Sequence, residues 1–239
     1  MAQKTLLQIA QTIMNQIGLP TPQAVVSASD QNMVKLLAVI KSVCEDLLFE
    51  FDWQILQKRY TFSTTSGVDN YAIPSDQERF ISFTFYDQNN RWKMQGPLTP
   101  TEWEQIKVSN LAASPFQRYR YYGGKLYLYP TPGTTTFNFN YEYISNAYCT
   151  SSAGVPQSDL MQDSDVILFD HRMVVYGAKV KWLNSIGMDT AAALGEYNRA
   201  VELAKGSDTP GRTLNLAGGT VGAPLLSTLN IPDTGFGGM

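Results

Sequence analysis

Apolar residues return every three or four positions through the first fifty residues of the chain, which is the period of an amphipathic helix. The pattern predicts a first helix that ends at Gly18, because a glycine followed by Pro20 stops helical geometry. A second, longer helix follows Ser29, its predicted cap, and keeps helical spacing through about Trp53. The apolar face of the first helix consists of Leu6, Ile9, Ile13 and Ile17.

At Lys58 the pattern changes to alternation with a period of two, in a stretch rich in Tyr, Phe and Thr that Gly and Pro interrupt. The alternation is clearest in the last predicted strand, where Phe137, Phe139, Tyr141 and Tyr143 share one face. Hairpin turns are predicted at residues 87–90 and 122–124. The candidate strands are residues 59–63, 70–73, 80–87, 91–94, 117–122, 125–129 and 136–145.

One short helix interrupts this β region. Thr99 is a capping residue, Pro100 suits the first helical position, and Glu102 stands three residues after the cap. We expect Trp103 and Ile106 to face the sheet.

Helical periodicity resumes after a polar loop at residues 150–158. A long helix is predicted from a cap at Asp163 or Ser164 to about Ser185, and a last helix from Asp189 to Gly206. The predicted fold class is α+β: a bundle of two N-terminal and two C-terminal helices, with a large antiparallel β insertion. The domains are expected at residues 1–57, 58–149, 150–206 and, for an extended arm, 207–239.

The arm from Ser207 to Met239 has seven Gly, three Pro and only three charged residues, and shows no sustained helical or strand period. Its charge content is too low, and its apolar residues are too regularly spaced, for a typical solvated tail. We therefore expect it to dock on a neighbouring subunit, where adding a strand to a sheet edge would satisfy its backbone. The predicted docking residues are Leu214, Leu216, Val221, Leu225, Leu226, Leu229, Ile231 and Phe236.

Charged residues are scarce: they make up 16% of the 239 residues, and the net charge is −3. This favours a surface covered by partners and gives no general attraction to nucleic acid. No apolar stretch is long enough for a transmembrane helix, so no membrane partner is expected. The two cysteines, Cys44 and Cys149, do not make a disulfide scaffold.

Candidate catalytic groups are few. His171 is the only histidine, which excludes a multi-histidine metal centre, and Asp163 and Asp165 fit a helix start better than a metal site. Asp46 and Glu50 share a helical face and could serve as paired carboxylates, but this spacing also describes any solvated helix face. No phosphate-binding or nucleophile motif is present. We expect no catalytic residues, no cofactor and no metal.

Tyrosines cluster in the second half of the β region. Tyrosine is enriched at protein interfaces because a large apolar ring carries a polar tip. Stacking on sugars or bases is the alternative, although a nucleic-acid platform usually has a basic groove as well. Candidate contacts with a neighbouring subunit or a tail nozzle are Tyr119, Tyr121, Tyr127 and Tyr129.

The block RYRYYGGKLYLYPTP at residues 118–132, and the N-terminal helix pair ending in Phe51-Asp52-Trp53, resemble the head-to-tail adaptor proteins of short-tailed bacteriophages, the tail tubular protein A-like family. The resemblance covers most of residues 1–206. It implies a structural virion protein of the neck, assembled in the host cytoplasm into a ring of twelve subunits. The ring would join the portal to the tail nozzle and line the channel through which DNA passes without sequence-specific contacts. The alternative is a phage-associated module that cleaves or binds peptidoglycan.

Overall fold

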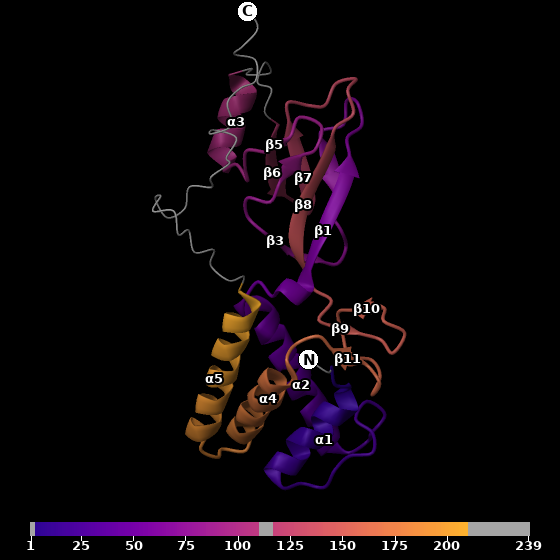
Figure 1. Cartoon of the computed structure of the whole chain (residues 1–239), viewed down its shortest axis with the longest axis vertical. Coiled ribbons are helices and arrows are strands. Elements are labelled where there is room, and N and C mark those ends of the chain that lie inside the picture. Colours follow the sequence, from indigo (N-terminus) through magenta and orange to yellow (C-terminus); the bar gives the residue numbers. More distant parts are fainter. Residues whose placement is uncertain (1–2, 110–116, 210–239) are drawn as a thin grey trace, which may run out of the picture. The chain divides into compact units, whose positions relative to one another are not determined.

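The computed structural model describes residues 3–109 and 117–209 (Figure 1). It separates the chain into one unit of residues 1–208 and a second unit of residues 209–239. The first unit is of the mixed α+β class, as the sequence predicts, with helices at both ends of this unit and antiparallel sheets between them. It contains two buried apolar clusters, one among the helices and one within the β region.

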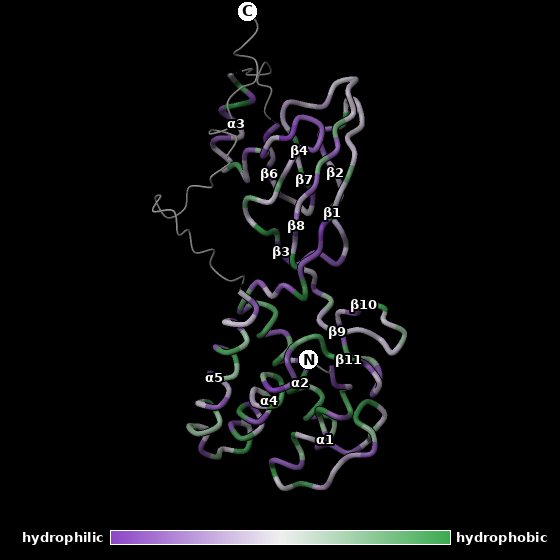
Figure 2. Tube along the Cα trace, viewed as in Figure 1, coloured by the Kyte–Doolittle hydropathy of each residue, from purple (hydrophilic) through white to green (hydrophobic). Residues whose placement is uncertain are grey.

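Four helices share the first cluster, and α4 contacts each of the other three. In Figure 2 apolar positions recur among polar ones along α1, α2 and α4, as the helical period predicts. Thr5 caps α1 in a capping box with Gln8, and Gly18 ends it with φ near 80°, a conformation that glycine adopts freely. The helices are α1 (Leu6–Ile17), α2 (Gln31–Glu50), α4 (His171–Ser185) and α5 (Ala191–Asp208).

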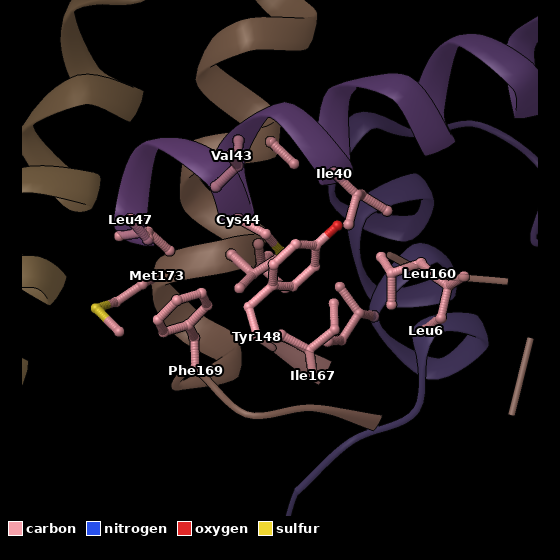
Figure 3. Close-up of a cluster of buried hydrophobic side chains, with 14 of the residues drawn as sticks. Leu6, Ile40, Val43, Cys44, Leu47, Tyr148, Leu160, Ile167, Phe169 and Met173 are labelled. Carbon is pink, nitrogen blue, oxygen red and sulfur yellow. The ribbon is translucent and has the colours of Figure 1, made fainter. Parts of the chain in front are cut away.

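Tyr148 fills the space where the loop after the β region meets α2. Its ring lies between Cys44 and Ile167, its hydroxyl points toward Ile40 (Figure 3), and only 3% of its surface is exposed. Cys44 of α2 is fully buried here, and burial raises the pKa of its thiol.

Tight packing also explains a glycine inside α4. A Cβ on Gly177 would lie 2.8 Å from Val43 Cγ1 and 3.0 Å from Tyr197 Cε2, so α4 approaches α2 and α5 closely at this residue. Gly195 in α5 is the matched contrast, because a Cβ there would meet nothing within 4 Å.

We predict opposite effects for the same substitution at these two glycines. Gly195→Ala should raise the free energy of unfolding by roughly 0.5–1 kcal/mol through helix propensity alone. Gly177→Ala should lower it, by on the order of 1 kcal/mol net, because overpacking outweighs that gain. Urea unfolding of both variants checks this, and equal stabilisation by both would contradict the close packing at Gly177.

The β region forms two larger sheets. The first has the order β1-β8-β4-β5, with β3 also paired to β8, and the second has the order β2-β7-β6. The pairings named here are antiparallel, and β1 matches β8 over seven residues, from Gln57↔Ile144 to Ser63↔Asn138. The strands are β1 (Gln57–Ser63), β2 (Asn70–Ala72), β3 (Gln77–Phe80), β4 (Tyr86–Asp87), β5 (Trp92–Lys93), β6 (Arg118–Tyr122), β7 (Lys125–Tyr129) and β8 (Asn138–Ser145).

Between the sheets and the helices the chain makes smaller elements. A 3₁₀ helix, η1 (Gln54–Leu56), links α2 to β1, and α3 (Pro100–Val108) has the predicted Thr99–Glu102 capping box with Trp103 buried. A three-stranded sheet of β10 (Pro156–Gln157), β9 (Cys149–Thr150) and β11 (Val166–Ile167) precedes α4.

Several predicted boundaries are wrong. The second helix is capped by Asp30, not Ser29, and ends at Glu50. The predicted strand over residues 80–87 is two strands, because a turn at Ser82 and Phe83 separates β3 from β4. The last helix continues past Gly206 to Asp208.

The largest correction concerns the start of α4. Its cap is Asp170, and residues 166–167 form β11 instead of the first helical turn. Asp163 instead accepts hydrogen bonds from the backbone amides of Val25 and Val26, at 3.0 and 2.9 Å. Asp165 accepts from the amides of Met161 and Gln162, both at 2.7 Å. The two carboxylates hold loops together and cap no helix.

Asp76 joins several elements of the β region through one carboxylate. It accepts hydrogen bonds from Lys58 Nζ at 2.7 Å, Ser145 Oγ at 2.9 Å and Tyr143 Oη at 3.0 Å. Partial burial raises the pKa of this carboxyl, but the three donors and the charge of Lys58 outweigh burial and leave it below its ordinary value.

A depressed pKa in the folded state means that the stabilisation is present above the unfolded pKa, near 3.8, and is lost as the pH falls through the folded value. We therefore predict that Asp76→Asn lowers the free energy of unfolding at pH 7, and that the difference from the unsubstituted protein shrinks below about pH 4. Unfolding curves at pH 7, 5 and 3 measure this. A difference that is constant with pH would contradict a role for the charge.

Candidate functional site

The eight predicted docking residues of the arm all lie outside the described residues. Their role therefore stays a prediction. What the structure does describe is the place where the arm begins. Asp208 ends α5 and accepts a hydrogen bond from the backbone amide of Gln54 at 2.8 Å, and its carbonyl accepts from the Gln54 side chain. Since Gln54 stands three residues before β1, the end of α5 is tied to the start of that strand.

A pocket of about 220 Å³ lies beside this junction. Its walls combine apolar side chains with the polar groups of Lys4, Asp170 and His171. The pKa of His171 is lowered, first by partial burial and then by the charges of Lys4 and Arg172, while Asp170 opposes the shift. Among the described residues no group of three or more potential ligands could hold a metal ion, so His171 has no ligating partners there.

The four predicted contact tyrosines divide between two faces of the sheet β2-β7-β6. Tyr119 is only 3% exposed and stacks on Phe85 with ring centroids 3.8 Å apart, and burial raises its pKa to about 12. Tyr121 lies edge-on to Phe80 but remains 43% exposed. Tyr127 and Tyr129 lie across from Arg120 and Arg118 in the β6–β7 register, on the opposite face from Tyr119. The geometry thus places Tyr119 within the β core and Tyr127 and Tyr129, both half-buried, on the outer face, where Trp103 of α3 lies edge-on to Tyr129 with ring centroids 6.2 Å apart.

The outer face also carries residues that the prediction did not include. Tyr122 stacks on Tyr127 with ring centroids 4.2 Å apart, and the Arg120 guanidinium lies 4.6 Å from the centre of the Tyr122 ring. Arg118 and Lys125 share this face, and no ion pair is found for them or for Arg120 among the described residues. We call Arg118, Arg120, Tyr122, Lys125, Tyr127 and Tyr129 the Tyr/Arg face.

The signal for the Tyr/Arg face was present in the sequence. Positions 118, 120 and 122 alternate with the buried side of one strand, and 125, 127 and 129 do so across the hairpin. The number of tyrosines alone does not distinguish the two faces of the sheet, whereas the alternation of side chains along the two strands of the hairpin does. An ordered stack of tyrosine and arginine is typical of the energetically important residues at protein interfaces.

The candidate paired carboxylates have lysine partners. Asp46 forms an ion pair with Lys181, and Glu50 Oε1 lies 2.9 Å from Lys205 Nζ. The Tyr197 hydroxyl donates to the other oxygen of Glu50 at 3.4 Å. These contacts link α2 to α4 and α5, so both carboxylates have a structural use that needs no substrate.

The neighbouring Asp52 has a similar use. Its Oδ1 lies 2.7 Å from Arg79 Nε, while the other two nitrogens of Arg79 donate to the carbonyls of Leu48 and Phe51, both at 2.8 Å. Arg79 in β3 thereby satisfies carbonyls at the C-terminal end of α2, which have no partner within the helix. The block Phe51-Asp52-Trp53 is thus where the helical and β parts of the unit are tied together.

Cys149 is buried like Cys44, and both cysteines are free thiols. The Cys149 thiol donates to the carbonyls of Gln157 and Asp159, and burial together with nearby aspartates raises its pKa to about 12. A buried thiol that stays protonated at neutral pH is a poor nucleophile, so packing accounts for this cysteine.

No helix among the described residues has the length and apolar character needed to cross a membrane. A search of curated proteins found no match for the chain. Residues 4–215 match the family model of the SU10 adaptor protein, which is well over half of the chain. That range includes the junction of Asp208 with Gln54, the Tyr/Arg face and the helices that share the first cluster. The chain belongs to the SU10 adaptor protein family, a family of phage head-to-tail adaptors.

Proposed function

We propose that copies of this chain form a ring that joins the portal to the tail nozzle in the phage neck. The observation that carries the proposal is the family match over residues 4–215, because an adaptor of this kind is a structural protein of the virion. By resemblance the ring has twelve subunits, and it is assembled in the host cytoplasm before the genome passes through its centre. With a net charge of −3, the protein offers DNA no strongly attractive surface, as suits a channel through which DNA must slide.

A cyclic ring needs two different surfaces on each subunit, one for each neighbour, and further surfaces for the portal and the nozzle. The Tyr/Arg face supports one of these roles. Tyrosine and arginine at its centre are pre-ordered by stacking, so little conformational entropy is lost when a partner covers them.

Phe83 supports another. Its side chain is 82% exposed and its φ is 65°, which is an uncommon conformation for a bulky residue. The Thr84 hydroxyl fixes this turn, donating to the Ile81 carbonyl at 2.7 Å and accepting from the Glu142 amide at 3.1 Å. An exposed aromatic ring on a fixed turn suits insertion into a partner's pocket.

The arm supplies the third contact in this proposal. Leu214, Leu216, Val221, Leu225, Leu226, Leu229, Ile231 and Phe236 are its anchors, and they dock on a neighbouring copy. Burying these side chains alone does not offset the entropy of ordering some twenty residues. The backbone of the arm must therefore also find hydrogen-bond partners on the neighbour.

The proposal is tested by measuring the mass of the purified full-length protein, alone and with portal protein, by light scattering. We expect a species many times heavier than one 26.6 kDa chain in the presence of portal. A chain that stays monomeric and unbound at micromolar concentrations of both proteins would contradict the proposal.

A further inference from the structure

Among the residues that the structure describes, β1 is an edge strand with one side unpaired. It ends the strand order of its sheet, and the strand it pairs with there is β8. The Asn138 carbonyl accepts from Gln88 and the Glu142 carbonyl accepts from Ile81, so the even-numbered residues of β8 point their backbone groups away from β1. The Phe137 carbonyl, by contrast, accepts from Thr64. In an antiparallel ladder this alternation continues along both strands.

The residues of β1 that point outward follow from this register. Residues 58, 60, 62 and 64 bond to β8, and Arg59, Thr61 and Ser63 direct their amides and carbonyls to the open side, whereas the Gln57 amide donates to the Gln54 carbonyl at the end of η1. No backbone hydrogen bond is found for Arg59, Thr61 and Ser63 on that side within the part of the chain that the structure describes. All three are exposed. The open side is therefore a row of unpaired donors and acceptors about five residues long.

Natural proteins usually protect such an edge with proline, bulges or outward charges. β1 contains no proline, and its register with β8 is unbroken over all seven residues. Both charged side chains of β1 have partners within the β region. Lys58 bonds to Asp76, and Arg59 donates to the Asn140 side chain in the amide orientation that satisfies both partners. The edge therefore remains able to accept another strand.

The side chains on the two faces of β1 determine which residue pattern a matching strand needs. Tyr60 and Phe62 pack against the β core on one face, while Arg59 and Thr61 are on the opposite, exposed face. Side chains of adjacent strands lie beside each other on the same face. A matching strand would thus alternate apolar residues, beside Tyr60 and Phe62, with polar residues beside Thr61.

The arm contains this pattern twice. Thr213-Leu214-Asn215-Leu216 and Thr228-Leu229-Asn230-Ile231 repeat the same order of polar and aliphatic residues, and neither block contains a charge, a glycine or a proline. Each block is a short segment with strand alternation inside an otherwise irregular tail.

The length of chain between Thr209 and each block favours the second block, Thr228–Ile231, for binding to a neighbouring copy. A compact unit the size of residues 1–208 has a radius of gyration of about 17 Å, so equivalent points on adjacent copies lie tens of ångströms apart. Leu214 follows Thr209 by five residues, which span at most about 17 Å, whereas Leu229 follows it by twenty, which span up to about 70 Å.

We propose that residues Thr228–Ile231 of one copy add a strand to the open edge of β1 in a second copy, with Leu229 and Ile231 beside Tyr60 and Phe62. This inference rests on the proposed function, because it gives the arm of a ring subunit its docking site. It also explains how the arm's backbone polar groups are satisfied on binding.

Thr61→Pro tests the edge directly. The amide of Thr61 points to the open side, so proline there leaves the bonds to β8 in place and removes one donor from the edge. Thr61→Ala is the matched control. We expect Thr61→Pro to keep the far-ultraviolet circular dichroism spectrum and weaken copy-to-copy association about tenfold, while Thr61→Ala associates normally. Equal association of the two variants would overturn the proposal.

Cysteine cross-linking tests whether the segment that pairs with the edge of β1 is Thr228–Ile231 of another copy. One preparation carries Thr61→Cys and another carries Asn230→Cys, so any disulfide between these positions joins two chains; both native cysteines are buried. We expect an interchain disulfide between the two, and a much lower yield when Leu229→Cys replaces Asn230→Cys, because residue 229 is on the other face. Leu229→Cys and Asn230→Cys linking equally well would overturn the strand geometry.

A single chain that carries both Thr61→Cys and Asn230→Cys separates the remaining occupants. A disulfide that forms only within that chain shows that the arm pairs with its own edge, and a loss of linking when portal is added shows that portal takes the block. Either result overturns the proposal. If the unsubstituted protein assembles with portal while Thr61→Cys and Asn230→Cys do not link, the edge pairing fails and the adaptor function stands. If it neither assembles nor links, both fail.

Discussion

Tyr141→Ala is expected to lower the free energy of unfolding by about 3–5 kcal/mol, the range for deleting a large buried aromatic ring. Tyr141 lies on β8, the central strand of its sheet, and is fully buried. Its ring stacks on Phe85 with centroids 4.5 Å apart and meets the rings of Tyr60 and Phe80 at 5.5 and 5.1 Å. Removing the ring leaves a cavity in contact with three strands and the loop before β4, and chemical denaturation measures the cost.

Tyr141→Phe is the matched control for this substitution. It keeps the ring and removes only the hydroxyl, which donates to Gln77 Oε1 at 2.9 Å. We expect this change to cost about 1 kcal/mol, the net value of one hydrogen bond. If Tyr141→Ala costs no more than Tyr141→Phe, aromatic packing around β8 does not stabilise the β region as the structure indicates.

Truncation after Thr209 is expected to abolish stable assembly while leaving a folded protein. The truncated chain keeps Asp208 and its hydrogen bonds to Gln54, as well as both buried clusters. Its melting temperature should therefore change little. Association with neighbouring copies should fall by a factor of a hundred or more, because several apolar anchors at roughly 1.5–3 kcal/mol each are lost together.

Two measurements on the truncated protein separate folding from assembly. Circular dichroism melting reports the core, and sedimentation velocity with portal reports the assembly. A truncated chain that melts as the full chain does and still forms the same large species would refute a role for the arm. A chain that fails to fold would instead show that residues beyond 209 belong to the core.

The sequence predicted those features that depend on near neighbours. The capping box of Thr99 and Glu102, the stop at Gly18 and the β6–β7 hairpin each involve residues within a few positions of one another, and the structure confirms all three. The helical stripes of α1 and α2 were equally visible, since burial follows the 3.6-residue period along most of each helix. The carboxylates Asp46 and Glu50 were correctly placed on α2, but their lysine partners on α4 and α5 were out of reach of a local reading.

The errors arose where distant residues decide the outcome. Asp163 looks like a helix cap because an apolar run follows it, yet its hydrogen-bond donors are amides 137 and 138 positions away. Val166 and Ile167 pair with Thr150 and Cys149, and this short pairing displaces the start of α4 to His171. In the candidate site, Tyr119 could not be separated from Tyr127 by composition. The alternation of faces along the hairpin does separate them, because Tyr119 faces the core and Tyr127 faces outward.

In the proposed function this chain works by assembling with copies of itself and with the portal. Electron microscopy of particles made from the full-length protein and portal tests this assembly. We expect class averages with a second ring of regular rotational symmetry attached to one end of the portal ring, and that ring should be missing when the chain stops at Thr209. Portal rings that carry no added density at saturating concentrations of the full-length chain would contradict it.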